Sequence, residues 1–259
     1  MPDLASTSIL CIAALLAGFV DAVAGGGGLI QVPALLFFAP NLTAATVLGT
    51  NKLSSIVGTS VALWRYRAAR LVKVQSWRYG MVASAVGGAA GAALASALSN
   101  AWMRPLVLVL TALVVLYVLF GSQWTQKTRN DVASDALLSP RNQVASGAVA
   151  GIYDGFYGPG TGSFLVAALV RYANFDALKA TAAAKTLNLA SNLGALIWFV
   201  AHGEVSVPLG ISLAACNAIG GLIGSHSANK LGPGFVRVVL ATVVFALLCL
   251  LSIQLISRW

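Results

Sequence analysis

Charged side chains are scarce in this chain, and acidic ones are rarer than basic ones. Only 9% of the 259 residues are charged, Asp and Glu together number seven, and 58% are hydrophobic. Soluble domains carry about 25% charged residues, so this composition excludes an ordinary soluble protein. The three cysteines, Cys11, Cys216 and Cys249, lie inside apolar runs. Their spacing fits neither a metal site nor a disulfide framework, and packing is their expected role.

Groupings of residues that carry catalysis are missing as well. His202 and His226 are isolated in the sequence. No Cys–His pair, Ser–His–Asp set or metal-ligand spacing is evident. We therefore expect a protein that is not an enzyme and that uses no metal and no cofactor.

Long apolar runs occupy most of the chain. About 20 apolar residues are enough to cross the roughly 30 Å hydrocarbon core of a bilayer as a helix. The clear runs are 4–24, 42–63, 80–98, 105–120, 178–200, 208–227 and 235–256, with shorter ones at 29–39, 144–156 and 163–170. The start, Met1-Pro2-Asp3, lacks the basic residues of a signal peptide, so the first run is expected to stay as a helix. The runs predict an all-α polytopic membrane protein.

The net charge of +9 comes largely from short loops rich in Lys and Arg. Arg65, Arg67, Arg70, Lys73 and Arg78 lie in one such loop, and Lys127, Arg129 and Arg141 lie in another. Short basic loops stay on the cytoplasmic side of a membrane. This placement accounts for the charge with a lipid bilayer as the partner, and no nucleic acid is expected to bind.

Residues 18–105 and 151–238 are two copies of one segment, aligned without a gap by an offset of 133. The matching positions are Gly18/Gly151, Asp21/Asp154, Gly25/Gly158, Gly27/Gly160, Asn41/Asn174, Lys52/Lys185, Gly87-Gly88/Gly220-Gly221, Gly91/Gly224 and Arg104/Arg237. Repeats that keep glycines and ions inside apolar stretches are typical of secondary transporters. We expect a first transmembrane repeat at 1–121, a cytoplasmic linker at 122–142 and a second repeat at 143–259.

Loop charges predict that the two copies have opposite orientations in the membrane. Loop 65–78 is strongly basic, whereas its partner after Trp198 contains Glu204 and no Lys or Arg. The loop at 39–43 is uncharged, whereas its partner at 171–179 carries two cations. Equivalent loops therefore face opposite sides, which requires an odd number of crossings per copy. We predict two inverted repeats of about five helical segments each, with both termini outside.

Each copy has a glycine-rich break at the end of its first apolar run. The breaks read Gly25-Gly26-Gly27-Gly28 and Gly158-Pro159-Gly160-Thr161-Gly162. In a helix interior glycine costs about 1 kcal/mol and proline about 3 kcal/mol relative to alanine. Irregular backbone at membrane depth survives only inside protein or beside a wet cavity. Because the segments that follow are too short to cross alone, we predict broken, re-entrant helical hairpins whose tips meet near the middle of the membrane.

A helix that starts just after such a break favours an anion, because its free N–H groups and the positive end of its dipole point into the cavity. Glycine also lets a ligand approach the backbone closely. The candidate binding residues are Gly25, Gly26, Gly27, Gly28, Gly158, Gly160, Thr161 and Gly162. The alternative is that these glycines serve only close helix crossing. That packing role is our interpretation of Gly87-Gly88-x-x-Gly91 and Gly220-Gly221-x-x-Gly224, which have no ion nearby.

Four ionic residues lie well inside apolar segments: Asp21, Asp154, Lys52 and Lys185. One central charge costs about 3 kcal/mol on insertion scales, so partners are expected. One interpretation is a structural pair of Asp–Lys salt bridges, formed within each copy. The other is that the lysines attract a substrate anion, while the aspartates pair with them, hold groups at the breaks or exchange protons. Asn51, Asn188 and Asn192 add polar groups on the same segments and are further candidates, and Ser191 shares the face of the last two.

These motifs resemble those of a known family. The segment Gly18-Phe-Val-Asp21-Ala-Val-Ala-Gly25-Gly-Gly-Gly28-Leu-Ile-Gln-Val-Pro33, followed by Gly49-Thr50-Asn51-Lys52, resembles the TauE/SafE sulfite exporter family of bacterial membrane proteins. The second copy, from Tyr153 to Gly162 with Lys185-Thr186-Leu187-Asn188, is similar to the second half of that family. The resemblance spans nearly the whole chain except the linker.

The resemblance implies a secondary transporter of the bacterial cytoplasmic (inner) membrane. Its expected substrate is a small sulfur-containing anion, namely sulfite, thiosulfate or an organosulfonate, moved by alternating access. The alternative is an anion or small-solute channel that uses the same hairpins. The coupling ion, H⁺ or Na⁺, the direction of transport and the oligomeric state stay open at this stage.

Overall fold

The computed structural model describes residues 2–120, 138–173, 175 and 177–227. Within these residues the fold is all helical, as predicted, with no strand. The elements are α1 (Leu4–Ala24), α2 (Gly28–Phe38), α3 (Ala44–Ala68), the 3₁₀ turn η1 (Val74–Trp77), α4 (Arg78–Ala97), α5 (Asn100–Phe120), α6 (Pro140–Phe156), α7 (Thr161–Ala173), α8 (Ala177–Ala201) and α9 (Val207–Ser227). Most of the predicted linker and the run at 235–256 lie outside the described residues.

Three of the described helices are long and apolar enough to cross a membrane: Leu4–Val23, Val74–Ala97 and Val207–Ser227. Shorter apolar helices lie at Gly28–Phe38, Asn100–Val114 and Thr161–Arg171. The spans expected at 42–63 and 178–200 are helical, within α3 and α8, but they are not among the long apolar helices. The reason is their polar content, which includes Lys52 and Lys185, and those side chains are buried inside the protein.

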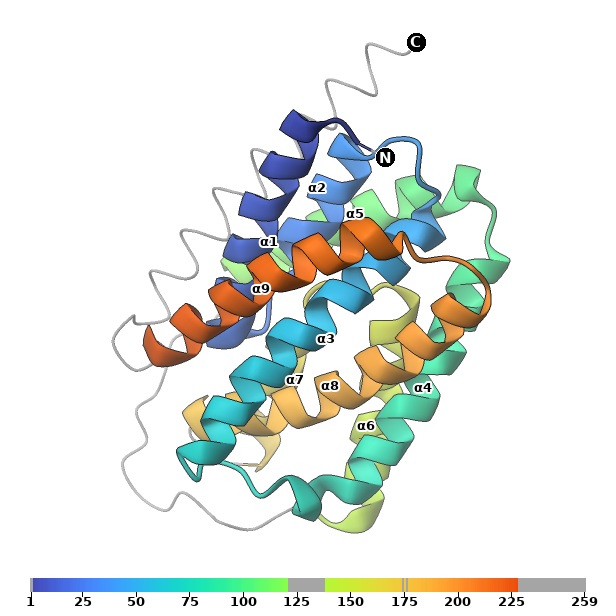
Figure 1. The fold of residues 1–259 in the computed structure, drawn as a ribbon. Helices are drawn as coiled ribbons and strands as arrows, with labels where there is room; N and C mark the ends of the chain where they lie inside the picture. Colours follow the sequence, from blue (N-terminus) through green and yellow to red (C-terminus); the bar gives the residue numbers. More distant parts are fainter. Residues whose placement is uncertain (1, 121–137, 174, 176, 228–259) are drawn as a thin grey trace.

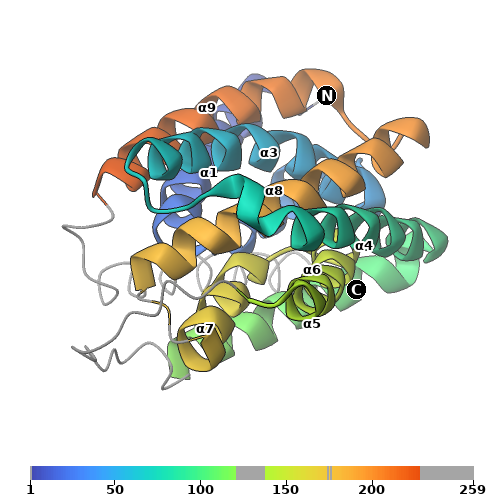
Figure 2. The ribbon, with the colours of Figure 1, turned by 90° about the horizontal axis from the view of Figure 1, so that it is seen from below.

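The first four helices of each copy correspond in place as well as in sequence. Helix α3 maps onto the bounds of α8 when 133 is added to its residue numbers. Helix α1 packs along α9, and its counterpart α6 packs along α4 (Figures 1 and 2). Glycine contacts repeat in the same way: Gly18 lies against the backbone of Asn217, and Gly151 lies against the backbone of Ser84. The first helix of each copy therefore packs against the fourth helix of the other copy, through equivalent residues.

Helices α3 and α8 cross at the centre of the molecule (Figure 1) and run in opposite directions. Near the start of α3, the Thr50 hydroxyl accepts a hydrogen bond of 2.9 Å from the backbone N–H of Ser206, just after α8 ends. At the other end, Leu71 and Leu178, one following α3 and one opening α8, line a common cavity. The basic loop and the loop of Glu204 therefore lie at opposite ends of α3.

The glycine seams of α4 and α9 serve packing, as interpreted from the sequence. A Cβ on Gly87 or Gly91 would meet the backbone of α6, and one on Gly220 or Gly224 would meet the backbone of α1. Helices can approach this closely only where no side chain stands between the two backbones. These seams fix α6 and α1 in place, and with them the breaks that follow each helix.

Candidate anion site

The two helix breaks contact each other at the centre of the molecule. Helix α1 ends at Ala24 and is capped by Gly25, which has a φ of 76°, and the second break contains Gly158 at 92° and Gly160 at 86°. The backbone N–H of Ser163 donates to the carbonyl of Gly25 at 3.2 Å. A Cβ on Gly25 would lie 2.5 Å from the carbonyl carbon of Gly162. The tips thus meet as the sequence predicted, and only glycine fits where they touch.

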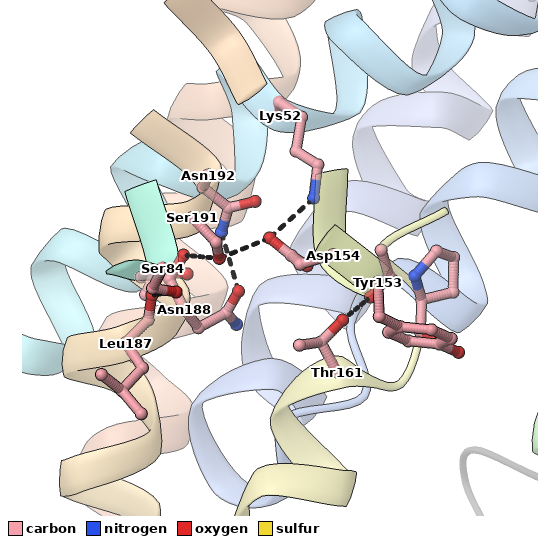
Figure 3. Close-up of polar contacts among 12 residues, drawn as sticks. Lys52, Ser84, Tyr153, Asp154, Thr161, Leu187, Asn188, Ser191 and Asn192 are labelled. Atoms are coloured by element: carbon pink, nitrogen blue, oxygen red, sulfur yellow. Dashed lines mark hydrogen bonds and ion pairs between the residues drawn. The ribbon is translucent and has the colours of Figure 1, made fainter. Parts of the chain in front are cut away.

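Side-chain hydroxyls tie down the second break. Tyr153 donates its phenolic hydroxyl to the carbonyl of Pro159 at 3.0 Å, and Thr161 donates to the carbonyl of Gly158 at 2.7 Å (Figure 3). The first break has no hydroxyl or charged side chain within 25–28. The two breaks therefore share a backbone plan, but only the second is fastened by its own side chains.

A small pocket lies at the contact of the breaks, with a cavity volume of about 20 Å³, which is room for about one water molecule. Its lining contains most of the residues predicted from the sequence: Asp21, Gly25, Gly28, Asn51, Lys52, Asp154, Gly158, Gly160, Gly162, Asn188 and Asn192. Four candidates, Gly26, Gly27, Thr161 and Lys185, lie outside this lining. Ser55 and Thr59 also line the pocket and were not predicted.

The duplication carried a signal for these two residues. Adding 133 to 55 and 59 gives Asn188 and Asn192, which the sequence analysis selected. Asn51, Ser55 and Thr59 also follow one another at intervals of four, so they share one face of α3. The pocket is therefore walled by two equivalent polar faces, one on α3 and one on α8.

Both Asp–Lys pairs form between the copies, which corrects the expectation of a pair within each copy. Lys52 of the first copy contacts Asp154 of the second, with 2.9 Å between Nζ and Oδ2. Lys185 of the second copy contacts Asp21 of the first, with 2.6 Å between Nζ and Oδ2. The reason is geometric: α3 packs against α8, and the breaks of α1 and α6 meet between them. Each lysine therefore reaches the carboxylate of the other copy.

The two lysines differ in what they face. Lys52 lines the pocket, and a Cβ on Gly158 would lie only 2.9 Å from its Nζ. The ammonium group of Lys52 therefore stands directly beside the second break. Lys185 is equally buried, but it is absent from the pocket lining and its Nζ is held by Asp21.

Hydroxyl and amide groups surround the two carboxylates. Ser191 donates to Oδ2 of Asp154 at 2.6 Å (Figure 3). Thr59 donates to Oδ2 of Asp21 at 3.2 Å. Asn192 donates to the side-chain oxygen of Asn188 at 3.1 Å. The side-chain oxygen of Asn51 is buried without a hydrogen-bond partner. A buried polar atom of this kind at a pocket wall is where a ligand or water is expected to bind.

The described residues contain a second cavity, of about 220 Å³, at the ends of α3 and α9. Arg65 and His226 contact each other there, with 3.1 Å between Nη2 of the arginine and Nδ1 of the histidine. None of the candidate binding residues lines this cavity. Among all the residues that the structure describes, no three His, Cys, Asp or Glu side chains come together in a way that could hold a metal ion.

Comparisons with known proteins place the chain among membrane transporters. The sequence model of the family described as sulfite exporter TauE/SafE matches residues 10–251. A probable membrane transporter protein, YfcA, of Escherichia coli strain K12 is 32% identical over 235 residues, which cover 91% of this chain and 85% of that protein. The probable membrane transporter protein ORF9 of Sinorhizobium is 34% identical over 250 residues, covering 95% and 93%.

A further probable membrane transporter protein, from Haemophilus influenzae, is 31% identical over 238 residues, covering 92% of this chain and 91% of its own. No solved structure matches the chain. The family match extends from α1 through both helix breaks and both ion pairs. The chain belongs to the sulfite exporter TauE/SafE family of membrane transporters.

Proposed function

We propose that the protein is a secondary transporter that moves a small sulfur-containing anion across the bacterial cytoplasmic membrane. Sulfite, thiosulfate and organosulfonates are the candidate substrates, and the sulfur chemistry rests on the family. The observation that carries the proposal is the position of Lys52, whose ammonium group stands in a buried pocket at the contact of two helix breaks. A buried cation with an adjacent polar pocket is the chemistry that attracts a small anion.

The proposed binding site combines charge with directional donors. Helix α7 begins at Thr161 beside the pocket, so the positive end of its dipole favours an oxyanion. Lys52 supplies the positive charge, and the amide groups of Asn51, Asn188 and Asn192 supply polar contacts from both walls. An oxyanion has several acceptor oxygens, and this arrangement offers it polar groups from α3 and α8 together with the positive end of the α7 dipole.

Lys185 has a different role in this proposal. It does not line the pocket, and its contact with Asp21 is shorter than that of the other pair. We assign direct anion contact to Lys52 and a positioning role to Lys185, which holds Asp21 and thereby the end of α1. Substrate contact by Lys185 would require the pocket to change shape.

We propose that the anion moves by alternating access, and the way the copies are assembled supports this mechanism. Helices α3 and α8 run in opposite directions, and α1 packs along α9 as α6 packs along α4. Inverted copies of this kind can exchange conformations, so that rocking one half against the other opens the pocket first to one side and then to the other. We propose that transport depends on this exchange of conformations.

The proposal is tested by uptake of labelled sulfite, thiosulfate and isethionate into proteoliposomes that contain the purified protein. We expect uptake of at least one of these anions and trans-stimulation, in which unlabelled anion inside accelerates labelled uptake. Lys52→Ala is expected to abolish uptake while the protein still folds. Uptake without trans-stimulation would indicate a channel, and no uptake of any of the three would contradict the proposed function.

A thermal-shift screen in detergent narrows the substrate before transport is measured. Sulfite, thiosulfate, taurine, sulfoacetate and simple carboxylates are compared at equal ionic strength. A ligand that binds the folded state raises the unfolding temperature in proportion to its occupancy. The Lys52→Ala protein is the matched control, because an anion that acts through the pocket should stabilise only the native sequence.

A further inference from the structure

The four charges of the site, three of them buried and that of Asp21 partly exposed, cancel one another, which sets a requirement for any anion that binds. Lys52 and Lys185 each face one carboxylate, Asp154 and Asp21 respectively, across distances of 2.9 and 2.6 Å. An anion that binds Lys52 brings a third negative charge beside two carboxylates. Excess charge in a buried site is strongly disfavoured unless it is neutralised. A proton on one carboxylate restores the balance.

Asp154 is the carboxylate that loses its partner when the anion arrives. Its counter-ion, Lys52, lines the pocket, whereas the counter-ion of Asp21 does not. An anion at Lys52 therefore competes with Asp154 for the ammonium group. The side chain of Asp154 is only 3% exposed, so water cannot compensate for the loss.

Around Asp154, two acceptor oxygens share a single hydroxyl hydrogen, so one further hydrogen can be accommodated. The Ser191 hydroxyl lies 2.6 Å from Oδ2 of Asp154 and 2.9 Å from the backbone carbonyl of Asn188. A hydroxyl has a single hydrogen and can donate to only one of these oxygens at a time. A protonated Asp154 can donate to the Ser191 oxygen, which then donates to the Asn188 carbonyl. Protonation thus completes the chain of hydrogen bonds.

Asp21 lacks this arrangement. Thr59 donates to Asp21 alone, at 3.2 Å, and Lys185 keeps its contact because it stands outside the pocket. The other groups that face Asp154 do not replace the proton. Lys185 on α8 is held by Asp21, Asp21 on α1 adds negative charge across the pocket, and Tyr153 donates its hydroxyl to Pro159. Helices α4 and α7 present Ser84, glycines and hydroxyls near this site and no acid or base.

We propose that Asp154 is the proton-carrying group of the transporter and that one proton moves with each anion. The proton binds to the carboxylate of Asp154 from the side on which the anion enters, as the anion takes Lys52. It leaves on the opposite side when the anion departs and Lys52 returns to the carboxylate. This inference rests on the proposed function, and for a singly charged anion the cycle moves no net charge.

Proton movement is measured with a trapped pH dye in proteoliposomes, with isethionate as the probe because it carries one fixed charge near neutral pH. Thiosulfate replaces isethionate if only thiosulfate is taken up. We expect the lumen to acidify in step with uptake, at one proton per anion, and an imposed inward proton gradient to accumulate the anion. For isethionate, a potential set with potassium and valinomycin should have no effect on the rate.

Asp154→Asn separates coupling from binding. It is expected to slow transport and to abolish acidification, while anion exchange between the two sides remains measurable. Glu204→Gln is the matched control, since it changes a partly buried acid that accepts a hydrogen bond from Ser96 outside the pocket, and acidification should persist. If Asp154→Asn does not fold, the measurements on the native protein still decide whether protons are coupled.

The outcomes distinguish the two proposals. Anion uptake without acidification, or accumulation driven by a Na⁺ gradient in its place, would overturn proton coupling and leave the transporter intact. Acidification that survives in Asp154→Asn but is lost in Asp21→Asn would overturn the assignment to Asp154. Absence of uptake of any tested anion would contradict the proposed function itself.

Discussion

Asp21 and Asp154 occupy equivalent positions in the two copies, yet their surroundings have diverged. Asp154 pairs with Lys52, which lines the pocket, and contacts a serine hydroxyl that also faces a backbone carbonyl. Asp21 pairs with Lys185, which lies behind the pocket wall, and its side chain is 15% exposed. A duplication supplies two copies of each ionic pair. The difference suggests that one pair binds the moving ligand while the other holds the scaffold.

The largest expected contrast is between Lys52→Met and Lys185→Met. Loss of Lys52 removes the charged partner of the anion, which costs about 2–5 kcal/mol of binding, or roughly 30-fold or more in affinity. Each change also leaves a carboxylate unpaired and lowers stability by about 3–5 kcal/mol. The loss should be toward the high end for Lys52→Met, because Asp154 is 3% exposed, and toward the low end for Lys185→Met, because Asp21 is 15% exposed. Thermal unfolding with and without the anion distinguishes the two, since only Lys185→Met should keep the shift caused by the anion.

Removing both charges of the Asp21–Lys185 pair provides the control for this contrast. Asp21→Asn combined with Lys185→Met should recover much of the stability that the single change loses, because no unpaired charge remains. An equal loss of the ligand response in Lys52→Met and Lys185→Met would show that both lysines bind the anion.

The duplicated sequence predicted the backbone breaks of the site better than it predicted which side chains pair with each other. Four glycines in a row and Gly-Pro-Gly-Thr-Gly cannot continue a helix, so both breaks and their mutual contact could be expected. Pairing of Lys52 with Asp154 could not, because an alignment relates equivalent positions and does not say which copy supplies the neighbour. Ser55 and Thr59 were missed for another reason: hydroxyls in helices often hydrogen-bond to their own backbone, so only their equivalence to Asn188 and Asn192 in the second copy marks them as pocket residues.

The next largest expected effect on stability is that of Gly25→Ala, which tests the contact between the two breaks. The new Cβ would lie 2.5 Å from the backbone of Gly162, at a residue with a φ of 76°. Overpacking costs about 1–3 kcal/mol, and the left-handed conformation adds about 1–2 kcal/mol. Gly203→Ala is the control, since Gly203 has a φ of 71° but nothing within 4 Å of its Cβ position.

Both variants carry the cost of a left-handed backbone, but only Gly25→Ala also meets the second break. The difference between their unfolding free energies therefore measures the contact of the breaks alone. It should be of the size expected for overpacking, and anion binding should weaken only in Gly25→Ala. Two variants of equal stability would mean that the first break can move away from the second at little cost.

A smaller effect compares the seams of α4 and α9. At Gly88 the new Cβ would clash with the backbone carbonyl of Ser191, whereas at the equivalent Gly221 it would lie 3.0 Å from the carbonyl of Gly58. Gly88→Ala is therefore expected to destabilise the protein by about 1–3 kcal/mol, and Gly221→Ala by less. Thermal unfolding without ligand measures both, and the reverse order would show that α9 packs more tightly than α4.

The smallest contrast concerns the hydroxyls beside the two carboxylates. Ser191 lies 2.6 Å from Asp154, the short distance of a hydrogen bond to a charged oxygen, whereas Thr59 lies 3.2 Å from Asp21. Hydrogen bonds to charged groups contribute about 1.5–3 kcal/mol and ordinary ones about 1 kcal/mol. Ser191→Ala should therefore lower stability more than Thr59→Val. The two changes are made again in the background of Asp154→Asn, where the charged acceptor is absent and the cost of Ser191→Ala should fall toward that of Thr59→Val. If the cost stays the same, the hydroxyl of Ser191 serves the Asn188 carbonyl and not Asp154, and the divergence of the two pairs would lie in the lysines alone.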